Sequence, residues 1–365
     1  MIGIIGGYGA VGFEACITLQ QLGIGPLKIG GRNPDIGKAK QQHFLSNASW
    51  EKLDVEHESS LLAFIQHCDL ILNCSAPSHR YARRIAEACI QQGVHLVDVG
   101  MDPDYARKPL HTGSSILLYA AGATPGFSGL FPRWCAKHFG TVHSLLSYYG
   151  SLGAITPAAA EDYLEAVIQP DYRPRAAWRQ GIVSQILTPQ RHISLPFFNT
   201  ELTLFPLFDA ETHLVAQKLT LQNGSWYAAV QGEHTVAFLD SASYAFQQNR
   251  QATIAQLVLA AEMDSLGRSP YFKLLLQLDG ECNGKQKTQT AFFQVDDIIP
   301  FCGKIAAIMV KAVMDGRVTP GLHHTAAIRD VDFVMEMLQS LLPPGSIQRI
   351  NTAITDLLID DEGSI

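Results

Sequence analysis

The 365-residue sequence lacks a C-x-x-C pair, a long run of lysine or arginine, and an apolar stretch long enough to span a bilayer. Its seven cysteines are scattered, mostly within apolar segments, so we expect reduced, buried thiols and neither a disulfide framework nor a zinc site. The net charge of −7 argues against nucleic acid or an anionic membrane as the partner. We therefore expect a small-molecule partner.

The sequence also lacks the features of an exported or disordered protein. Its first residues already form an apolar segment without a basic leader, so we expect neither export nor membrane insertion, and a cytoplasmic location. With 47% hydrophobic and 17% charged residues, the composition is that of an ordinary globular protein. A chain of this length exceeds one typical core, which predicts two domains.

The first residues combine a short apolar strand, a glycine-rich turn and a helix. Ile2, Ile4 and Ile5 are typical of a buried strand, and GYGAVG at 7–12 fits G-x-G-x-x-G ahead of a helical stretch at 13–21. Such a turn places a pyrophosphate at the helix N-terminus, whereas the alternative is a structural turn without a ligand. The expected cofactor-binding residues of this turn are Gly7, Tyr8, Gly9, Ala10, Val11 and Gly12.

Strand-like and helix-like segments alternate up to about residue 122. We expect strands at 26–30, 51–55, 69–74, 95–99 and 115–120, and helices at 61–67 and 81–92. Strand–helix–strand units of this size predict an α/β fold, a doubly wound parallel-sheet Rossmann domain.

The end of the second predicted strand indicates which dinucleotide binds. An NAD-binding protein normally carries Asp or Glu there, but this sequence reads Gly30-Gly31-Arg32-Asn33. A guanidinium without a competing carboxylate suits a 2′-phosphate, so we expect NADP(H), bound by Arg32 and Asn33. Lys38 either adds a second positive charge or is an ordinary surface lysine.

Polar residues follow the next two strands at the carboxyl edge of the sheet. Asn73, Ser75, Ala76 and Pro77 are expected next to the ribose or pyrophosphate of the cofactor. His79 is either a functional acid or a solvated loop residue. Asp98 ends an apolar strand and is costly to bury alone, so it either caps a backbone group or faces the site.

Beyond residue 122 the sequence changes to β-branched and aromatic runs broken by Gly and Pro. We expect a second α+β domain on a mixed or antiparallel sheet, with strands near 143–149, 193–198, 202–207, 226–232 and 287–294. Helices are expected at 129–138, 158–167, 250–263 and 302–314. The expected domains are a Rossmann domain at 1–127, a substrate-binding and dimerisation domain at 128–300, C-terminal helices returning to the Rossmann domain at 301–345, and a tail at 346–365 that frays from 356.

Several segments together resemble the saccharopine dehydrogenase and reductase superfamily: GGYGAVG at 6–12, GGRN at 30–33, CDLILNCSAP at 68–77, GVHLVDVG at 93–100 and AGATPGFSGL at 121–130. The resemblance implies an NADP(H)-binding Rossmann domain, an inserted α+β domain, a homodimer, and hydride transfer at a carbon–nitrogen bond of an amino-acid-derived substrate. Since the chain is short for a saccharopine reductase, the hypothesis is a thiazoline or imine reductase in siderophore or other specialised metabolism.

Reduction of an imine requires one acid near the substrate nitrogen. The expected acids are Asp98, His79 and Tyr149, although Tyr149 is equally explained as a core aromatic residue. The expected substrate-binding residues are Asp98, Gly122, Thr124, Pro125, Tyr149, Thr156 and Glu161. Helix capping and dipole compensation are the alternative for the last two. No metal is expected, since the adjacent pair His323-His324 has no ligand partner at suitable spacing.

Two other functions compete with imine reduction. One is the reduction of a C=C bond, as in an enoyl thioester or a lipid. The other is a non-catalytic NADP(H)-binding sensor, which binds the dinucleotide without oxidising it.

Overall fold

In the computed structural model of the chain, residues 1–45, 47–102, 104–105 and 108–362 are described, and they divide into two compact units. The first unit comprises Met1–Leu130 and Ile299–Leu342, and the second comprises Phe131–Ile298 and the residues from Pro343 on. The segment from Pro343 on, expected partly as a loose tail, is thus part of the second unit.

The first unit is built on a seven-stranded sheet in the order β15-β6-β5-β4-β1-β2-β3, and every pairing in it is parallel. The strands are β1 (Ile2–Ile5), β2 (Leu27–Gly31), β3 (Ala48–Lys52), β4 (Leu70–Asn73), β5 (His95–Asp98), β6 (Ile116–Tyr119) and β15 (Gly321–His324). The doubly wound Rossmann fold expected from the sequence is confirmed.

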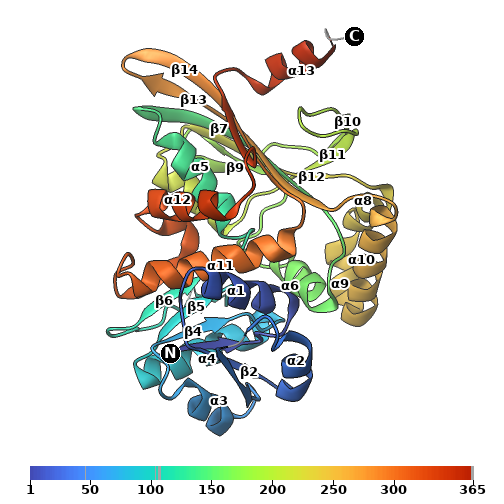
Figure 1. Cartoon of the computed structure of the whole chain (residues 1–365). Coiled ribbons are helices and arrows are strands. Elements are labelled where there is room, and N and C mark those ends of the chain that lie inside the picture. The colour runs from blue at the N-terminus through green and yellow to red at the C-terminus, as the bar shows by residue number, and fades with distance from the viewer. Residues whose placement is uncertain (46, 103, 106–107, 363–365) are drawn as a thin grey trace. The chain divides into compact units, whose positions relative to one another are not determined.

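Helices cover both faces of this sheet (Figure 1). They are α1 (Ala10–Gln21), α2 (Pro34–Gln41), α3 (Glu58–Ile65), α4 (Ser78–Gln92), α11 (Ile298–Met314) and α12 (Val331–Leu341). Gly303 lets α11 cross α1 closely, because a Cβ at this position would lie 2.6 Å from the Cβ of Glu14. The last long apolar helix expected from the sequence therefore packs directly on the helix that follows the glycine turn.

Two elements of this sheet differ from the sequence expectation. β3 lies at 48–52 and not at 51–55, because the buried Leu53 fills the space beside Gly30, where a Cβ would lie 2.8 Å from the Leu53 side chain. β15 was not expected, since GLHH has no apolar alternation. It joins the edge of the sheet by pairing with β6.

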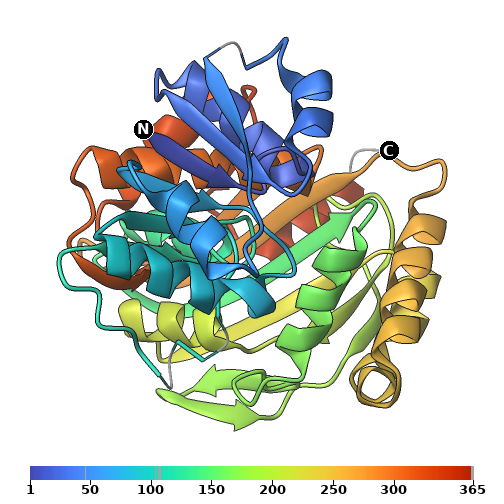
Figure 2. The ribbon, with the colours of Figure 1, turned by 90° about the horizontal axis from the view of Figure 1, so that it is seen from below.

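The second unit is built on a nine-stranded mixed sheet, seen from two directions in Figures 1 and 2. Its main path runs β10-β11-β12-β7-β13-β14-β16, and β8 and β9 extend it beside β12. Only the pairing of β12 with β7 is parallel among the described pairs of this sheet. The strands are β7 (Thr141–Leu152), β8 (Ala176–Arg179), β9 (Ile182–Gln185), β10 (Gln190–Ile193), β11 (Leu202–Pro206), β12 (Asn223–Val230), β13 (Tyr271–Cys282), β14 (Lys285–Val295) and β16 (Ile347–Ile350).

The helices of the second unit include several that the sequence did not indicate. α5 (Phe127–Ala136) leads into the unit, and the others are α6 (Pro157–Val167), α7 (Ala210–Lys218), α8 (Glu233–Leu239), α9 (Ala242–Gln248), α10 (Arg250–Ser265) and α13 (Ile354–Glu362). α6, α9 and α10 share an apolar cluster that contains Leu164, Phe246 and Leu257. Among the described residues, no helix has both the length and the apolar composition to cross a membrane.

The first part of the expected C-terminal tail, before residue 356, forms regular structure in the second unit. β16 pairs antiparallel with β14, and the backbone N–H of Ile354 donates to Gln277 Oε1 at 2.9 Å. The Thr290 hydroxyl also donates to the carbonyl of Thr352 at 2.7 Å. These long-range contacts hold a segment whose own sequence shows no clear strand or helix pattern. Residues 363–365 of the expected tail lie outside the described part.

His324 ends β15 and is buried neutral. Its Nδ1 accepts a hydrogen bond from the backbone N–H of Ala326 at 3.0 Å and so caps the short 3-10 helix Thr325–Ala327. Its ring meets that of Tyr119 edge-on, with centroids 5.1 Å apart. Burial lowers the pKa of His324 to about 4.

We predict that the His324→Asn variant loses less stability in mild acid than the parent protein does. An unfolded histidine takes up a proton near pH 6.5, whereas folded His324 does so near 4, so protonation favours the unfolded state as the pH falls between these values. Asparagine retains a cap acceptor without a titrating ring. Urea unfolding at about pH 7.5 and about pH 5 should show a free-energy loss smaller by about 1–2 kcal/mol in the variant.

His323→Asn serves as the matched control because the neighbouring ring is only partly buried and should change this loss little. An equal loss in the parent and in His324→Asn would contradict the assignment.

Candidate functional site

The turn between β1 and α1 is closed by backbone contacts that only glycine permits. Gly6 has φ +74°, and Gly9 N–H donates to the Gly6 carbonyl at 3.0 Å. A Cβ at Gly12 would lie 2.3 Å from that carbonyl oxygen. The tight turn therefore uses Gly6, and Gly7 is needed for packing instead, since its Cβ would lie within 2.9 Å of Ile4 and Ile29.

The amino end of α1 is open to an anion. Gly9 is the N-cap residue and makes no side-chain cap, and α1, whose residues are all described, has no acidic residue in its first turn. A Cβ at Gly9 would meet only the Gly6 carbonyl, at 3.2 Å, so the outer side of the turn is free. Unpaired N–H groups and the helix dipole favour negative charge here. The residues present, including Ala10 and Val11 in the first turn, fit a dinucleotide pyrophosphate.

Tyr8 supports the end of β2. Its hydroxyl accepts a hydrogen bond from the backbone N–H of Asn33 at 2.8 Å. Its side chain occupies the space above Gly31 and Gly37, where an added Cβ would come within 2.2 Å of the hydroxyl and 2.7 Å of the ring, respectively. Tyr8 thus holds the loop that carries Arg32, a supporting role that the motif alone does not indicate.

Arg32 follows β2 with an exposed side chain. Its positive charge helps to lower the pKa of Asp54, for which the hydrogen bond from the Glu56 backbone is the larger cause. Arg32 and Arg80 also both oppose the rise in the pKa of Tyr81 that burial causes. Arg32 and Arg80, which lies at the start of α4, therefore both lie near Tyr81. The sequence signal for Arg80 is only its position shortly after the end of β4.

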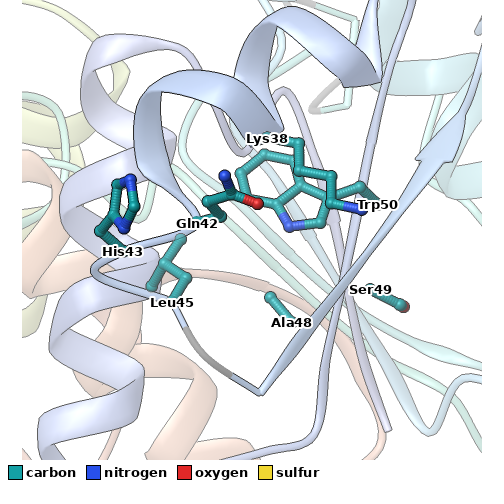
Figure 3. A pocket seen from close by; sticks show the side chains of 7 residues that line it. All are labelled: Lys38, Gln42, His43, Leu45, Ala48, Ser49 and Trp50. Carbon is teal, nitrogen blue, oxygen red and sulfur yellow. The ribbon is translucent and has the colours of Figure 1, made fainter.

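Lys38 lies elsewhere. It lines a pocket of about 410 Å³, together with Gln42, His43, Leu45, Ala48, Ser49 and Trp50 (Figure 3). Ala48 begins β3 and pairs with Leu27 at the amino end of β2, whereas Arg32 follows the carboxyl end. Figure 3 shows the Lys38 side chain beside the Trp50 indole, and Arg32 is not among the residues that line this pocket.

Asn73 and Asp98 join the carboxyl ends of β4 and β5. Asn73 Nδ2 donates to Asp98 Oδ2 at 3.0 Å, and Asn73 Oδ1 accepts from the backbone N–H of Ser75 at 3.0 Å and from its hydroxyl at 2.6 Å. Asp98 Oδ1 accepts from Gly100 N–H at 2.9 Å, and Asp98 is 1% exposed. Of the two roles left open for Asp98, the structure favours backbone capping over catalysis, because its carboxylate is buried and engaged.

The segment after β4 leads directly into α4. Pro77 is the N-cap residue, without a side-chain cap, and Ala76 before it is exposed. His79 lies in the first turn of α4 and is partly buried. Gly100 touches this turn, since its Cβ would lie 2.2 Å from that of Ser78. The ends of β4 and β5 thus form one continuous edge.

The loop after β6 extends this edge. Ala121 N–H donates to the Asp98 carbonyl at 2.9 Å, and Ala123 N–H donates to Cys302 Sγ at 3.4 Å. Gly122 is buried, whereas Thr124 is exposed and Pro125 is partly buried. The expected substrate residues of this loop therefore adjoin Asp98.

The remaining expected residues lie in the second unit. Tyr149 is in β7, and burial is the main cause that raises its pKa. Thr156 is the N-cap of α6, and its hydroxyl accepts from Ala159 N–H at 3.2 Å. Glu161 is in the middle of α6. Thr156 therefore caps a helix, which is the alternative to substrate binding that the sequence left open.

His323 and His324 make separate hydrogen bonds to backbone groups. The described residues contain no group of three His, Cys, Asp or Glu side chains arranged to hold a metal ion. His323 Nε2 is instead within hydrogen-bond distance of the Thr319 carbonyl, at 2.9 Å.

Comparison with known proteins agrees with the glycine turn and with the residues after β2. Residues 2–123 match the family model of the saccharopine dehydrogenase NADP binding domain. This part of the chain is a saccharopine dehydrogenase-type NADP-binding domain. The resemblance noted in the sequence is thereby confirmed, as is NADP(H) as the cofactor.

The fold is shared with one of the solved structures that match the chain. Apo saccharopine dehydrogenase (L-Glu forming) from Saccharomyces cerevisiae superposes with a TM-score of 0.70 at 14% identity, covering 96% of this chain and 99% of that one. An amine dehydrogenase from Mycobacterium smegmatis has a TM-score of 0.49 at 10% identity, covering 90% and 96%. No curated protein sequence matches the chain. At the level of fold, the chain thus matches that saccharopine dehydrogenase over nearly its whole length.

We predict that Gly9→Ala and Gly12→Ala both weaken NADPH binding but lower the free energy of unfolding by different amounts. Gly12→Ala forces the turn apart and should lower the free energy of unfolding by about 1–3 kcal/mol. Gly9→Ala meets only one atom, at 3.2 Å, and should cost less than about 1 kcal/mol. Its methyl group nevertheless occupies the side from which the pyrophosphate approaches, so NADPH should bind about tenfold more weakly or worse.

Fluorescence titration with NADPH and urea unfolding measure the two effects separately. If Gly9→Ala bound NADPH as tightly as the parent, the phosphate would have to bind somewhere else.

Proposed function

We propose that this protein is an NADPH-dependent reductase of a C=N bond in an amino-acid-derived substrate. The observation that carries the proposal is the uncapped amino end of α1 together with the exposed Arg32 at the end of β2. The coarser assignment, an NADP-dependent oxidoreductase fold, already follows from the domain match.

The residues of the first unit have distinct tasks in this proposal. NADPH, when bound, supplies a hydride to the imine carbon. The first turn of α1 holds the pyrophosphate, Arg32 binds the 2′-phosphate, and Asn33 is kept in place by Tyr8. Ser75, Ala76 and Pro77 border the ribose and pyrophosphate, since they lie at the adjoining strand end. The loop 122–125 presents substrate-facing groups at the same edge.

The proton for the imine nitrogen comes, in this proposal, from His79 or Tyr149. Asp98 is set aside because it holds Asn73 and Gly100 in place. Tyr149 carries its phenolic proton at neutral pH, and burial raises its pKa and so makes it a weaker acid than a free tyrosine. The second unit is proposed as the substrate-binding and dimerisation domain of a cytoplasmic homodimer, and siderophore or other specialised metabolism as the setting.

NADPH oxidation against a panel of substrates tests this function. The panel contains 2-oxo acids paired with amines, cyclic imines, thiazolines, and enoyl thioesters. Imine-dependent oxidation is expected. Oxidation with the enoyl thioesters alone would establish C=C reduction instead, and NADPH binding without any oxidation would establish a sensor.

We predict that Arg32→Ala raises the Michaelis constant for NADPH by about 10- to 100-fold, through the loss of charged hydrogen bonds to the 2′-phosphate. The constant for NADH should change little, because NADH lacks that group. Lys38→Ala is the matched control, since this lysine lines a pocket with Trp50 that does not include Arg32, and the variant should leave both constants nearly unchanged. Equal effects of Arg32→Ala on both dinucleotides would remove Arg32 from the 2′-phosphate site.

A further inference from the structure

The long helix α10 of the second unit packs through one face and leaves apolar residues on the opposite one. Figure 1 shows it beside α8 and α9. Its inner face is buried and consists of Thr253, Leu257, Ala260 and Asp264. Leu257 shares an apolar cluster with Leu164 of α6 and Phe246 of α9. A helix that covers a core on one side normally turns charged and polar residues to solvent on the other side, and the outer face of α10 departs from this pattern.

The outer face carries five apolar residues, which we term the α10 stripe. They recur at intervals of three or four positions along the chain: Ala252, Ala255, Leu259, Met263 and Leu266. With about 3.6 residues per turn, these positions lie on one side of the helix, opposite to the buried face. All five are exposed, and the three large side chains, Leu259, Met263 and Leu266, are 56%, 42% and 77% exposed. Leu266, the C-cap residue, ends the stripe.

Both ends of α10 are held in place, so the stripe is a preformed surface. At the amino end, Asn249 caps the helix, and its Oδ1 accepts from Ala252 N–H at 3.1 Å. Near the carboxyl end, Asp264 Oδ2 accepts from the backbone N–H of Thr235 in α8 at 2.7 Å. A rigid face of this kind loses little conformational freedom when a partner covers it.

The charges of α10 indicate the kind of partner. A continuous apolar stripe marks an interaction site, whereas apolar residues that are exposed singly are normal. α10, whose residues are all described, has no lysine, and its one arginine, Arg250, is ion-paired with Glu165 and lies 4.6 Å from the centroid of the Phe246 ring. The exposed charge next to the stripe is that of Glu262. Because helices that bind a membrane surface are rich in lysine and arginine, a protein partner fits this face better.

The order of small and large residues in the stripe suits a second copy of the same helix. When two copies of α10 pack antiparallel about a two-fold axis at Leu259, positions equally far from this residue in opposite directions face each other. Ala255 then faces Met263 of the second copy, and Ala252 faces Leu266 of the second copy. Each large side chain therefore fills the space above a small one, and the two Leu259 side chains meet at the axis. Parallel packing would instead place alanine on alanine and leave gaps there.

We propose that the α10 stripe is the surface through which two copies of this chain associate, with the two α10 helices antiparallel and Leu259 at the two-fold axis. The inference rests on the homodimer included in the proposed function, and it does not depend on the reaction that the enzyme catalyses. It assigns the contact to one face of one helix, whereas the sequence indicated only the domain.

Sedimentation velocity of the full chain measures the association. The parent should be a dimer at a concentration of about 10 μM. Leu259→Glu brings two carboxylates together at the axis and should raise the dissociation constant of the dimer about 100-fold or more. Ile182→Glu is the matched control and should sediment like the parent, because Ile182 of β9 is 65% exposed and lies outside the stripe. Both replaced side chains are exposed, so both variants should fold, which urea unfolding verifies.

Cysteine cross-linking tests the antiparallel register. Leu259→Cys should form an intermolecular disulfide under mild oxidation, since this position meets its own copy at the axis. The double variant Ala255→Cys with Met263→Cys should cross-link as well. Either single variant should not, because its two cysteines lie about 12 Å apart along the helix pair. The parent and Ile182→Cys give the background from the native cysteines. Cross-linking of the two single variants alone would contradict the antiparallel register.

The outcomes separate this surface from the proposed function. A dimer that Leu259→Glu leaves intact would overturn the α10 contact and retain the homodimer. A monomeric parent would overturn both, and its co-sedimentation with vesicles of phosphatidylcholine and phosphatidylglycerol would make the stripe a membrane-binding face instead.

Imine-dependent NADPH oxidation is assayed in parallel. A dimer that Leu259→Glu dissociates, without any such oxidation by the parent, would support the α10 contact and overturn the reductase. Oxidation by a parent that does not associate through α10 would overturn the contact and retain the reductase.

Discussion

The first unit depends on the close approach of Gly12 to the carbonyl oxygen of Gly6. Any Cβ at Gly12 would lie 2.3 Å from that oxygen, so only glycine lets α1 begin directly beside the end of β1. The amino end of the helix is thereby directed to the carboxyl edge of the sheet, where β4 and β5 also end. The same device recurs at Gly303, which brings α11 against α1. Two close backbone contacts thus define the edge that binds the dinucleotide.

Buried polar groups give that edge its shape. Asn73 and Asp98 satisfy each other and the backbone of Ser75 and Gly100, so neither is left unpaired in a low-dielectric environment. A carboxylate at a strand end looks like a catalytic acid in sequence. Here its hydrogen bonds hold the side chain of Asn73 and the backbone of Gly100 in place.

The second unit shows where local patterns stop being informative. Aromatic and β-branched runs predicted a mixed sheet, but β13 and β16 were missed, and β16 forms only because β14 offers an edge.

The sequence by itself determined the glycine turn, the alternation of strands and helices, and the arginine that replaces a carboxylate after β2. These features rest on contacts between neighbours along the chain, namely steric exclusion in a turn and the repeats of apolar residues in helices and strands. Only the tertiary structure decided that Asp98 caps a backbone group, that Lys38 lines a pocket with Trp50, and that residues 347–350 form an edge strand. Each of these depends on which distant segment supplies the hydrogen-bond partner or the packing surface, and a one-dimensional pattern does not contain that choice.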